Sequence, residues 1–592
     1  MKSAHQKIQA ITGIMVILLV ALFGRVAWIK AVHGDEYEQA AQQQQVMQTD
    51  TKIPALRGTI VDSKGEVLGL SERVYNVILD CKAIRGSGTA LYNSTIQKMA
   101  EILEIDESVI EQYLTDEYAN TRYQRFDEGM GISYSKQQML QQAIENDDIA
   151  GIWFEEDEKR SYVNGSLMAH VLGFNGSYGI EQVYNEELTG IDGRQMVVAN
   201  NAGSFVEEYT PAHDGDTITL TLDATLQYYL EKDLQEGVEK YNAISGCAIA
   251  MDPQTGAILG LANVPTFDLN NALSAIGVTP KFTQTYGTPG SNEEYYQYIW
   301  KNYAVNDTYE PGSTFKPIFA SAALQEAVLN ENTTFYCGGT IEYYDARIQC
   351  AYQEVHNVEV LRDIIRNSCN IGMTQISSLL GTQGWIPYQR AFGIGQKTGV
   401  DLTGEVSASS LVYGEDMGPV ELATTAFGQG FNVTPMQLIT AFSAVINGGE
   451  LLTPYVVDHI TDSYGNIVMS GGKQVSRYPI SKEVSDTMRS YLKDVVESGT
   501  GSKAQVEGYT IGGKTGTAQK IGNDGRYKED SYVCSFIGFT PVDDPEVILL
   551  VILDEADNGT SNQPSEIAAD IFADILPYLN IYPDQNQTGE TP

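Results

Sequence analysis

The sequence is poor in basic residues. Its 592 residues include 37 Lys and Arg against 77 Asp and Glu, which gives a formal net charge of −40 at pH 7. A nucleic-acid-binding surface needs clustered Lys and Arg to neutralise phosphates, so we expect no nucleic-acid partner. The acidic excess is typical of a solvated surface, and the chain length predicts two or more domains that each bury a core.

Paired metal-ligating residues are also missing. The six cysteines include no Cys-x-x-Cys pair and the six histidines no His-Glu-x-x-His motif, so we expect no zinc site and no other cofactor. Cys337 and Cys350 border a hairpin-like stretch, FYCGGTIEYYDARIQC. If this stretch lies outside the cell membrane, we expect a disulfide between them. The alternative is two unpaired buried thiols.

A helix is missing where one motif requires it. Gly508, Gly513, Lys514 and Thr515 match the phosphate-loop pattern, which must be followed by a helix whose N-terminus binds phosphate. The residues after Thr515, GTAQKIGNDGRYKED, contain glycines and a turn signal but no helical apolar repeat. We therefore exclude an ATP-driven motor and expect Lys514 to lie in a strand.

One long apolar run is present, at the N-terminus. Residues 8–24, IQAITGIMVILLVALFG, carry no charge, and the run extends to Ile29 if Arg25 reaches the membrane surface. Lys2 and Lys7 precede the run and predict a cytoplasmic N-terminus. Because no small-x-small cleavage site follows, a single-pass anchor in the cell membrane is favoured over a cleaved signal peptide. The remaining chain would then be extracytoplasmic.

Composition divides the chain into four parts. We predict a cytoplasmic tail and transmembrane anchor over residues 1–33, a support or docking domain over 34–215, a main domain over 216–580 and a polar tail over 581–592. In the main domain, strand patterns such as TITLTL, GCAIAMD and EVILLVILDE flank a helical middle, and a helix closes the chain. This order, with helix and strand at both ends around a helical middle, predicts an α/β sandwich in which helices flank a sheet.

Three short motifs in a fixed order indicate chemistry. In YEPGSTFKP, Ser313 opens an apolar helix and Lys316 follows one turn later on the same face. A lysine there could deprotonate the serine if its own pKa were lowered by burial or by a neighbouring cation. NSCN then supplies Ser368 and Asn370, and GGKTGTA supplies Lys514.

Ser-x-x-Lys and Lys-Thr-Gly are each weak evidence alone, because both recur in the chain. Ser-x-x-Lys also occurs at Ser133/Lys136 and Ser470/Lys473, and Lys-Thr-Gly also occurs at Lys397. Neither of these two Ser-x-x-Lys sequences opens an apolar helix, and Lys397 lies between glycine-rich turns. We therefore expect a single site formed by Ser313 with Lys316, Ser368 with Asn370, and Lys514.

Together the motifs resemble the class B penicillin-binding proteins, the monofunctional D,D-transpeptidases of peptidoglycan synthesis. RGTIVD and GIEQVYNEELTG resemble their pedestal signatures, and AFGQGFNVTPMQL and SYVCSFIGFTPVDDPE resemble the division and sporulation branch. The resemblance covers nearly the whole chain. It implies an α+β transpeptidase domain with the penicillin-binding and serine β-lactamase-like fold, which has a sheet flanked by helices and an all-helical subdomain. It also implies that residues 34–215 form an elongated pedestal domain of the penicillin-binding protein dimerisation type.

The resemblance also implies roles for particular residues in acyl transfer between D-Ala-D-Ala stem peptides. Ser313 would be the nucleophile and Lys316 the base, Ser368 would relay a proton to the leaving D-alanine, and Asn370 would hold the substrate amide and Lys316. Lys514 would add positive potential that favours neutral Lys316. It would bind the substrate at a site formed with Thr515, Gly516 and Thr517, and the amides of Ser313 and Thr517 would form the oxyanion hole. Implied partners are β-lactams, the cytoplasmic membrane, a polytopic glycan polymerase and divisome proteins.

Three alternatives share these residues. A secreted β-lactamase needs a deacylating base and has no use for an anchor or a pedestal. A D,D-carboxypeptidase would use the same residues with water as the acceptor, and the sequence does not exclude this activity. A non-catalytic β-lactam sensor or scaffold would keep the fold alone, and the complete set of motif residues argues against it. A septal, a sporulation and an elongation role all fit the sequence.

Overall fold

The computed structural model describes residues 50–174, 176–199, 205–290, 293–522 and 525–583, together with single positions between Ala21 and Lys30. Within these described stretches, no helix has both the length and the apolar character needed to cross a membrane. Apart from those single positions, the predicted anchor at residues 8–29 lies outside the described residues, as does the chain after Pro583.

The chain forms two compact units whose segments alternate along the sequence. The first unit consists of residues 1–56, 73–158 and 190–214, and the second of residues 57–72, 159–189 and 215–592. Gly215 begins the longest segment of the second unit, next to the boundary that composition predicts.

The first unit contains a small helical core and a separate ribbon of strands. Its helices are α2 (Cys81–Gly86), α3 (Thr89–Leu103), α4 (Glu107–Glu111) and α5 (Tyr134–Glu145), and its sheet has the order β1 (Asp50–Ile53), β5 (Gly193–Ala199), β6 (Phe205–Thr210). Ile96, Met99 and Leu103 lie on one face of α3 and pack against Leu140 of α5. Their spacing is that of an amphipathic helix.

A five-stranded antiparallel sheet organises the second unit. Its order is β20 (Gly512–Ile521), β21 (Tyr527–Thr540), β22 (Val547–Asp554), β8 (Ser245–Met251) and β9 (Ile258–Val264). In β22, Leu549 and Val551 belong to one apolar cluster, whereas Leu550 and Ile552 belong to the other. Both faces of the strand are therefore buried, which explains why EVILLVILD has no polar face.

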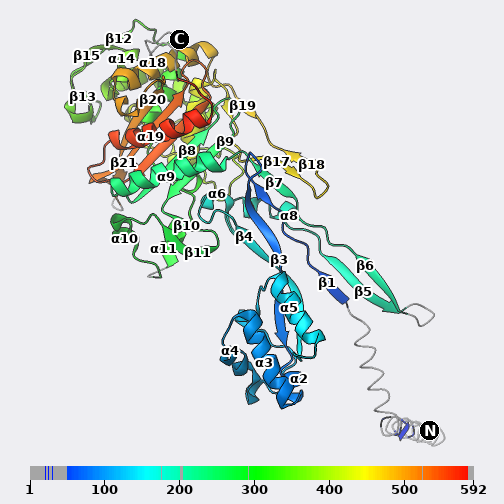
Figure 1. Ribbon diagram of the computed structural model, residues 1–592. Coiled ribbons are helices and arrows are strands. Elements are labelled where there is room, and N and C mark those ends of the chain that lie inside the picture. The colour runs from blue at the N-terminus through cyan, green and yellow to red at the C-terminus, as the bar shows by residue number, and fades with distance from the viewer. Residues whose placement is uncertain are drawn as a thin grey trace, which may run out of the picture. The chain divides into compact units, whose positions relative to one another are not determined.

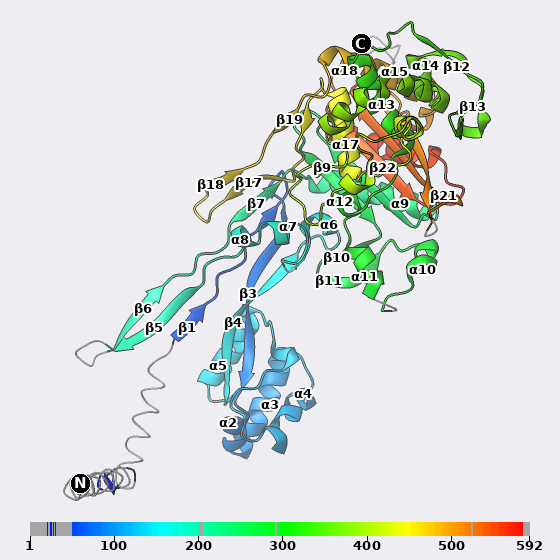
Figure 2. The same cartoon turned by 180° about the vertical axis from the view of Figure 1, so that it is seen from behind.

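Helices cover both faces of this sheet. In Figure 1, α9 (Ala224–Lys240) and α19 (Asn562–Tyr578) lie over one face, and the view from behind in Figure 2 shows α13 (Lys316–Gln325) and α17 (Pro435–Ile446) over the other. The other helices of the unit are α6 (Ala169–Leu172), α7 (Gly179–Val183), α8 (Asn185–Leu188), α10 (Pro280–Tyr286), α11 (Glu293–Trp300), α12 (Tyr303–Asn306), α14 (Leu361–Arg366), α15 (Asn370–Ala391), α16 (Pro419–Ala426) and α18 (Lys482–Ser498). The predicted helix-flanked sheet is confirmed.

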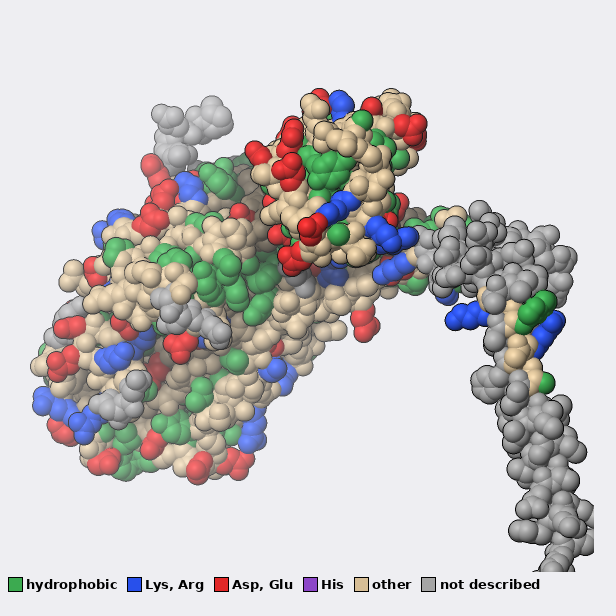
Figure 3. Space-filling view, turned by 90° about the horizontal axis from the view of Figure 1, so that it is seen from below, with side chains coloured by type: hydrophobic (Ala, Val, Ile, Leu, Met, Phe, Trp, Pro, Cys, Tyr) green, Lys and Arg blue, Asp and Glu red, His purple; other side chains and the backbone are tan. Residues whose placement is uncertain are grey.

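The remaining described strands outside the region between α13 and α14 form a second large sheet and two short pairs. A six-stranded sheet has the order β18 (Ile467–Ser470), β17 (Val457–Thr461), β7 (Thr217–Leu220), β2 (Ile60–Val61), β3 (Val67–Leu79), β4 (Ile152–Tyr162). Two-stranded pairs join β10 (Thr266–Asp268) to β11 (Asn271–Ile276) and β16 (Leu451–Leu452) to β19 (Val475–Arg477). On the face drawn in Figure 3, acidic and basic side chains are interspersed.

An insertion between α13 and α14 bears on the site. Here β12 (Thr334–Cys337) pairs with β15 (Asn357–Val360), and β13 (Thr340–Tyr343) pairs with β14 (Ala346–Gln349). The hairpin predicted between Cys337 and Cys350 is confirmed. We call residues 334–360 the insertion below.

Candidate active site

Ser313 lies in a short 3-10 turn, residues 312–315, that leads into α13. Gly312 has φ +58°, and a Cβ atom there would lie 2.9 Å from the carbonyl oxygen of Thr517. The Gly312 amide also donates to the Gly428 carbonyl at 2.9 Å. Only glycine fits this left-handed backbone and close approach, so the turn holds Ser313 against strand β20.

Lys316 is the first residue of α13 and is fully buried. Its Nζ donates to the Ser368 carbonyl at 2.5 Å, to Ser368 Oγ at 3.1 Å and to Asn370 Oδ1 at 2.8 Å. Loss of solvation on burial lowers the pKa of Lys316 to about 8, although nearby Cys369, Cys350 and Glu359 act in the opposite direction. A neutral amine is therefore accessible near physiological pH.

Ser368 stands between two lysines. It has φ +57°, a left-handed backbone that a non-glycine residue adopts only when its surroundings require it. Its Oγ accepts from Lys316 Nζ at 3.1 Å and from Lys514 Nζ at 3.0 Å. Asn370, two residues on, begins α15, and its Nδ2 donates to the Gln349 carbonyl of the insertion at 2.8 Å.

Lys514 lies on β20, the outer strand of the five-stranded sheet. Besides Ser368, its Nζ contacts the Thr515 carbonyl at 3.2 Å, and Thr515 Oγ1 lies 2.9 Å from Thr500 Oγ1. Gly516 packs tightly, since a Cβ there would lie 3.0 Å from the Pro311 carbonyl oxygen, whereas Thr517 is exposed. In this stretch of β20, Lys514, Thr515 and Gly516 are therefore buried, and Thr517 is exposed.

The two lysines disfavour each other's charge. Burial lowers the pKa of Lys514 well below its usual range, and the ammonium of Lys316 lowers it further. Both Nζ atoms contact the same hydroxyl oxygen, so the two ammonium charges would lie close together. The pair therefore loses a proton more readily than a lysine exposed to solvent. Among the described residues, the Ser313 hydroxyl has no hydrogen-bond partner. Such bonds commonly form only when substrate binds.

The competing motif sequences have ordinary structural roles. Ser133 caps α5, and Lys136 pairs with Glu104 at 2.9 Å. Lys473 pairs with Glu450. Lys397 lies in a loop, and β20 continues through Thr515 to Ile521 without the helix that a phosphate loop needs. The structure therefore brings together Ser313, Lys316, Ser368, Asn370, Lys514 and the strand residues Thr515, Gly516 and Thr517.

Two features of this region differ from the prediction or were missed. The predicted disulfide is wrong: Cys337 and Cys350 are free thiols whose sulfur atoms lie 3.6 Å apart. The reason is that a third thiol, Cys369, shares their pocket, with its sulfur 3.7 Å from that of Cys350. The contact of Thr500 with Thr515 was also missed, because no motif includes Thr500.

The site thus combines a serine at the start of a helix, a buried lysine amine with a lowered pKa and a strand at the edge of the sheet. The family model for the penicillin binding protein transpeptidase domain matches residues 246–577, and that for the penicillin-binding protein dimerisation domain matches residues 52–178. The chain belongs to the penicillin-binding protein family.

Individual relatives match over nearly the whole length. Stage V sporulation protein D of Bacillus subtilis is 33% identical, over 97% of this chain and 86% of that protein. Peptidoglycan D,D-transpeptidase FtsI of Escherichia coli is 27% identical, over 98% of this chain and 92% of that protein. The crystal structure of penicillin binding protein 2X from Streptococcus thermophilus superposes with a TM-score of 0.75 at 25% identity, covering 89% of this chain and 80% of that one.

A further solved structure shares the fold. Penicillin binding protein 3 from Mycobacterium tuberculosis, in complex with aztreonam, superposes with a TM-score of 0.66 at 22% identity and covers 91% of this chain and 100% of that chain.

Proposed function

We propose that this protein is a peptidoglycan D,D-transpeptidase of cell division or sporulation, which cross-links stem peptides through an acyl-enzyme on Ser313. The observation that carries the proposal is the convergence of Lys316 and Lys514 on Ser368 Oγ, at 3.1 and 3.0 Å, next to the turn that holds Ser313. The names of the relatives from Bacillus subtilis and Escherichia coli support the same reaction and processes.

Acylation begins at Ser313. Its Oγ attacks the carbonyl carbon of the penultimate D-alanine, and its proton passes to the neutral amine of Lys316. The bond between this carbonyl carbon and the terminal D-alanine nitrogen then breaks, and the leaving amine receives a proton through the Ser368 hydroxyl. The contacts of Ser368 Oγ with both lysine amines support this role.

Deacylation forms the cross-link. An amine of a second stem peptide attacks the ester carbon, gives up a proton through the same lysine and serine, and releases Ser313 with its proton restored. The backbone amides of Ser313 and Thr517 stabilise the oxyanion in both steps, a contribution of about 3 kcal/mol for each donor. The close approach of the Gly312 turn to Thr517 supports this pairing of donors.

Substrate recognition uses the outer strand. An extended stem peptide pairs along β20, as peptides do at exposed sheet edges. Lys514, Thr515 and Thr517 bind the terminal carboxylate of the substrate. A β-lactam mimics the D-Ala-D-Ala end and acylates the same serine, and the aztreonam complex of the mycobacterial relative with this fold is consistent with such binding.

The protein acts at the cell membrane in this proposal. The uncharged residues 8–24, preceded by Lys2 and Lys7, support a single-pass anchor with a cytoplasmic N-terminus and an extracytoplasmic catalytic domain. A polytopic glycan polymerase and divisome proteins are the partners that would supply glycan strands and place the enzyme.

A peptide assay with the purified full chain tests the reaction. A stem pentapeptide ending in D-Ala-D-Ala, offered with a second stem peptide as amine, should release D-alanine and yield a cross-linked dimer. Ser313→Ala should yield neither product, and Ser133→Ala, which changes the serine of another Ser-x-x-Lys sequence, should match wild type. D-alanine release without dimer would indicate a carboxypeptidase. No product from folded wild type would favour a scaffold.

A further inference from the structure

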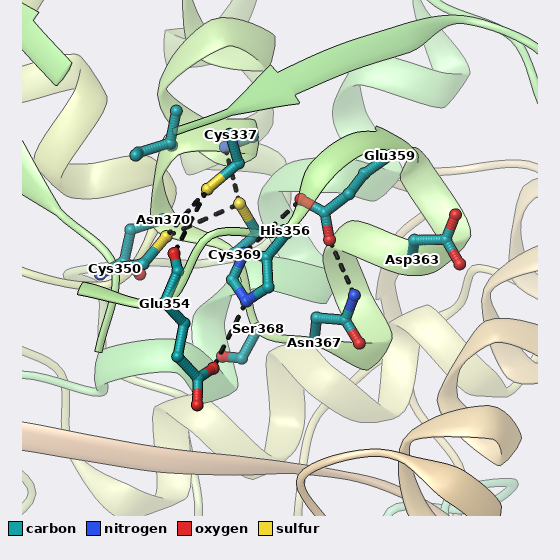
Figure 4. A network of polar contacts seen from close by, with 12 residues as sticks. Cys337, Cys350, Glu354, His356, Glu359, Asp363, Asn367, Ser368, Cys369 and Asn370 are labelled. Carbon is teal, nitrogen blue, oxygen red and sulfur yellow. Dashed lines mark hydrogen bonds and ion pairs between the residues drawn. The ribbon is translucent and has the colours of Figure 1, made fainter. Parts of the chain in front are cut away.

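Four potential metal ligands meet beside the active site. The sulfur atoms of Cys337, Cys350 and Cys369 and a ring nitrogen of His356 all lie within 4.8 Å of one another. Figure 4 shows the three sulfurs gathered above the histidine ring. All three cysteines are buried, with at most 4% of their surface exposed. Three thiols and one imidazole form a donor set that is common in structural zinc sites.

The sulfur distances fit a tetrahedral ion rather than a disulfide. Two thiolates that each lie 2.3 Å from a tetrahedral zinc ion are about 3.8 Å apart. The distances here are 3.6 Å between Cys337 and Cys350 and 3.7 Å between Cys350 and Cys369. Bonded sulfurs would be about 2.05 Å apart, and a disulfide between any two would leave the third thiol alone in the pocket.

His356 has polar atoms that the protein does not satisfy. Its side chain is only 10% exposed, and neither ring nitrogen has a hydrogen-bond partner within the described residues. Its nearest carboxylates are Glu359, 3.7 Å from Nδ1, and Glu354, 3.5 Å from Nε2. Metal-bound histidines typically donate their other ring N–H to such a group. Whichever nitrogen binds an ion, the other has a carboxylate nearby.

The sulfur of Cys369 also has a backbone donor. The amide of Gly372, at the start of α15, lies 3.2 Å from this sulfur. An N–H group directed at sulfur favours the thiolate form, which is the form that binds metal.

We propose that Cys337, Cys350, His356 and Cys369 bind a structural zinc ion. Soft thiolates with one imidazole in tetrahedral arrangement select zinc over magnesium or calcium. Three thiols lose their protons to solvent as the ion binds, so Zn²⁺, three thiolates and neutral imidazole give a centre of charge −1 and three released protons. All four positions are filled by protein, so the ion has no open site for substrate.

The ion would position the catalytic motif. Cys369 lies between Ser368 and Asn370, and the other three ligands come from the insertion, residues 334–360. Cys350 follows Gln349, whose carbonyl oxygen accepts from Asn370 Nδ2 at 2.8 Å. Zinc therefore fastens the insertion to the loop that contacts Lys316. This proposal replaces the prediction of no zinc site from the sequence, which considered only close pairs such as Cys-x-x-Cys, whereas successive ligands here lie 6 to 13 residues apart.

The first experiment uses the full wild-type chain, purified without a histidine tag that would itself bind zinc. Elemental mass spectrometry after dialysis should find one zinc ion per chain. X-ray absorption at the zinc edge should show three sulfurs at about 2.3 Å and one nitrogen at about 2.0–2.1 Å. A zinc coordination shell that contains only oxygen and nitrogen would overturn the proposal. So would a protein that retains no zinc on dialysis after incubation with zinc. So would a Cys337–Cys350 disulfide in non-reducing peptide mapping.

The second experiment compares matched cysteine variants. Cys337→Ser should lose zinc on dialysis, whereas Cys247→Ser, which alters a buried free cysteine of β8 outside the cluster, should keep it. If Cys337→Ser does not fold, the absorption spectrum of wild type still decides. Full zinc retention by folded Cys337→Ser would contradict the ligand assignment. Since these readouts need no substrate, they are independent of the proposed transpeptidase activity.

Discussion

The pH dependence of acylation follows from the burial of Lys316. Burial lowers its pKa to about 8, and only the neutral amine can accept the proton of Ser313. The neutral fraction is then about a half at pH 8, about a tenth at pH 7 and about a hundredth at pH 6. Acylation by a β-lactam, followed by stopped-flow absorbance, should therefore rise about tenfold per pH unit below about pH 7 and level off above about pH 9.

Asn370→Asp changes this profile in a defined direction. Asn370 Oδ1 accepts from Lys316 Nζ at 2.8 Å, so an aspartate of the same size would place a negative charge beside the ammonium. An opposite charge at this distance shifts a pKa by about 1–3 units towards the charged form. The pKa of Lys316 should rise, moving the midpoint from about 8 to about 9–11 and slowing acylation at pH 7 by about tenfold or more.

Lys136→Ala is the matched control for both measurements. Lys136 belongs to a second Ser-x-x-Lys sequence and pairs with Glu104 at 2.9 Å, so its removal should leave the profile of wild type. A flat wild-type profile between pH 6 and pH 9 would show that Lys316 is not the base. A midpoint displaced to lower pH in Asn370→Asp would refute the electrostatic reasoning.

Three further perturbations have defined outcomes. Gly312→Ala should destabilise the protein by about 1–2 kcal/mol in thermal unfolding and slow acylation, because its φ of +58° is unfavourable for alanine and the new Cβ would meet Thr517; an unchanged melting temperature would contradict this. Glu181→Gln should lower the free energy of unfolding in urea by about 3–5 kcal/mol, because the buried Glu181 carboxylate pairs with Arg57 at 2.6 Å and Arg160 at 2.8 Å; a change within error would show that this network is not stabilising. Calorimetry with magnesium and ATP should detect no saturable binding, because β20 continues where a phosphate loop would begin a helix, and micromolar affinity would overturn that assignment.

The sequence predicts which residues form the site because their order is informative. Ser313 and Lys316 are one helical turn apart, which fixes their common face, and the alternating pattern around Lys514 indicates a strand. The contacts of Ser368 were not predictable in the same way. They depend on a left-handed backbone at φ +57° that places its hydroxyl between two lysines from distant segments. Local propensity carries no signal for such a conformation.

Two further features depend on the tertiary fold. The disulfide prediction considered Cys337 and Cys350 as a pair, because sequence spacing could not show that Cys369 and His356 join them. The second unit also includes residues 57–72 and 159–189, far upstream of its main segment. A composition shift reveals where one segment begins, but it cannot show that earlier segments return to the same unit.

Mass spectrometry after reaction with penicillin tests the role of Ser313 most directly. The folded wild-type chain should gain one penicilloyl group, located on the peptide that contains Ser313, and release it far more slowly than it forms. Ser313→Ala should gain none. An adduct on Ser133 or Ser470, rapid turnover of the drug, or no adduct on folded wild type would contradict the assignment of Ser313 as the nucleophile of a transpeptidase.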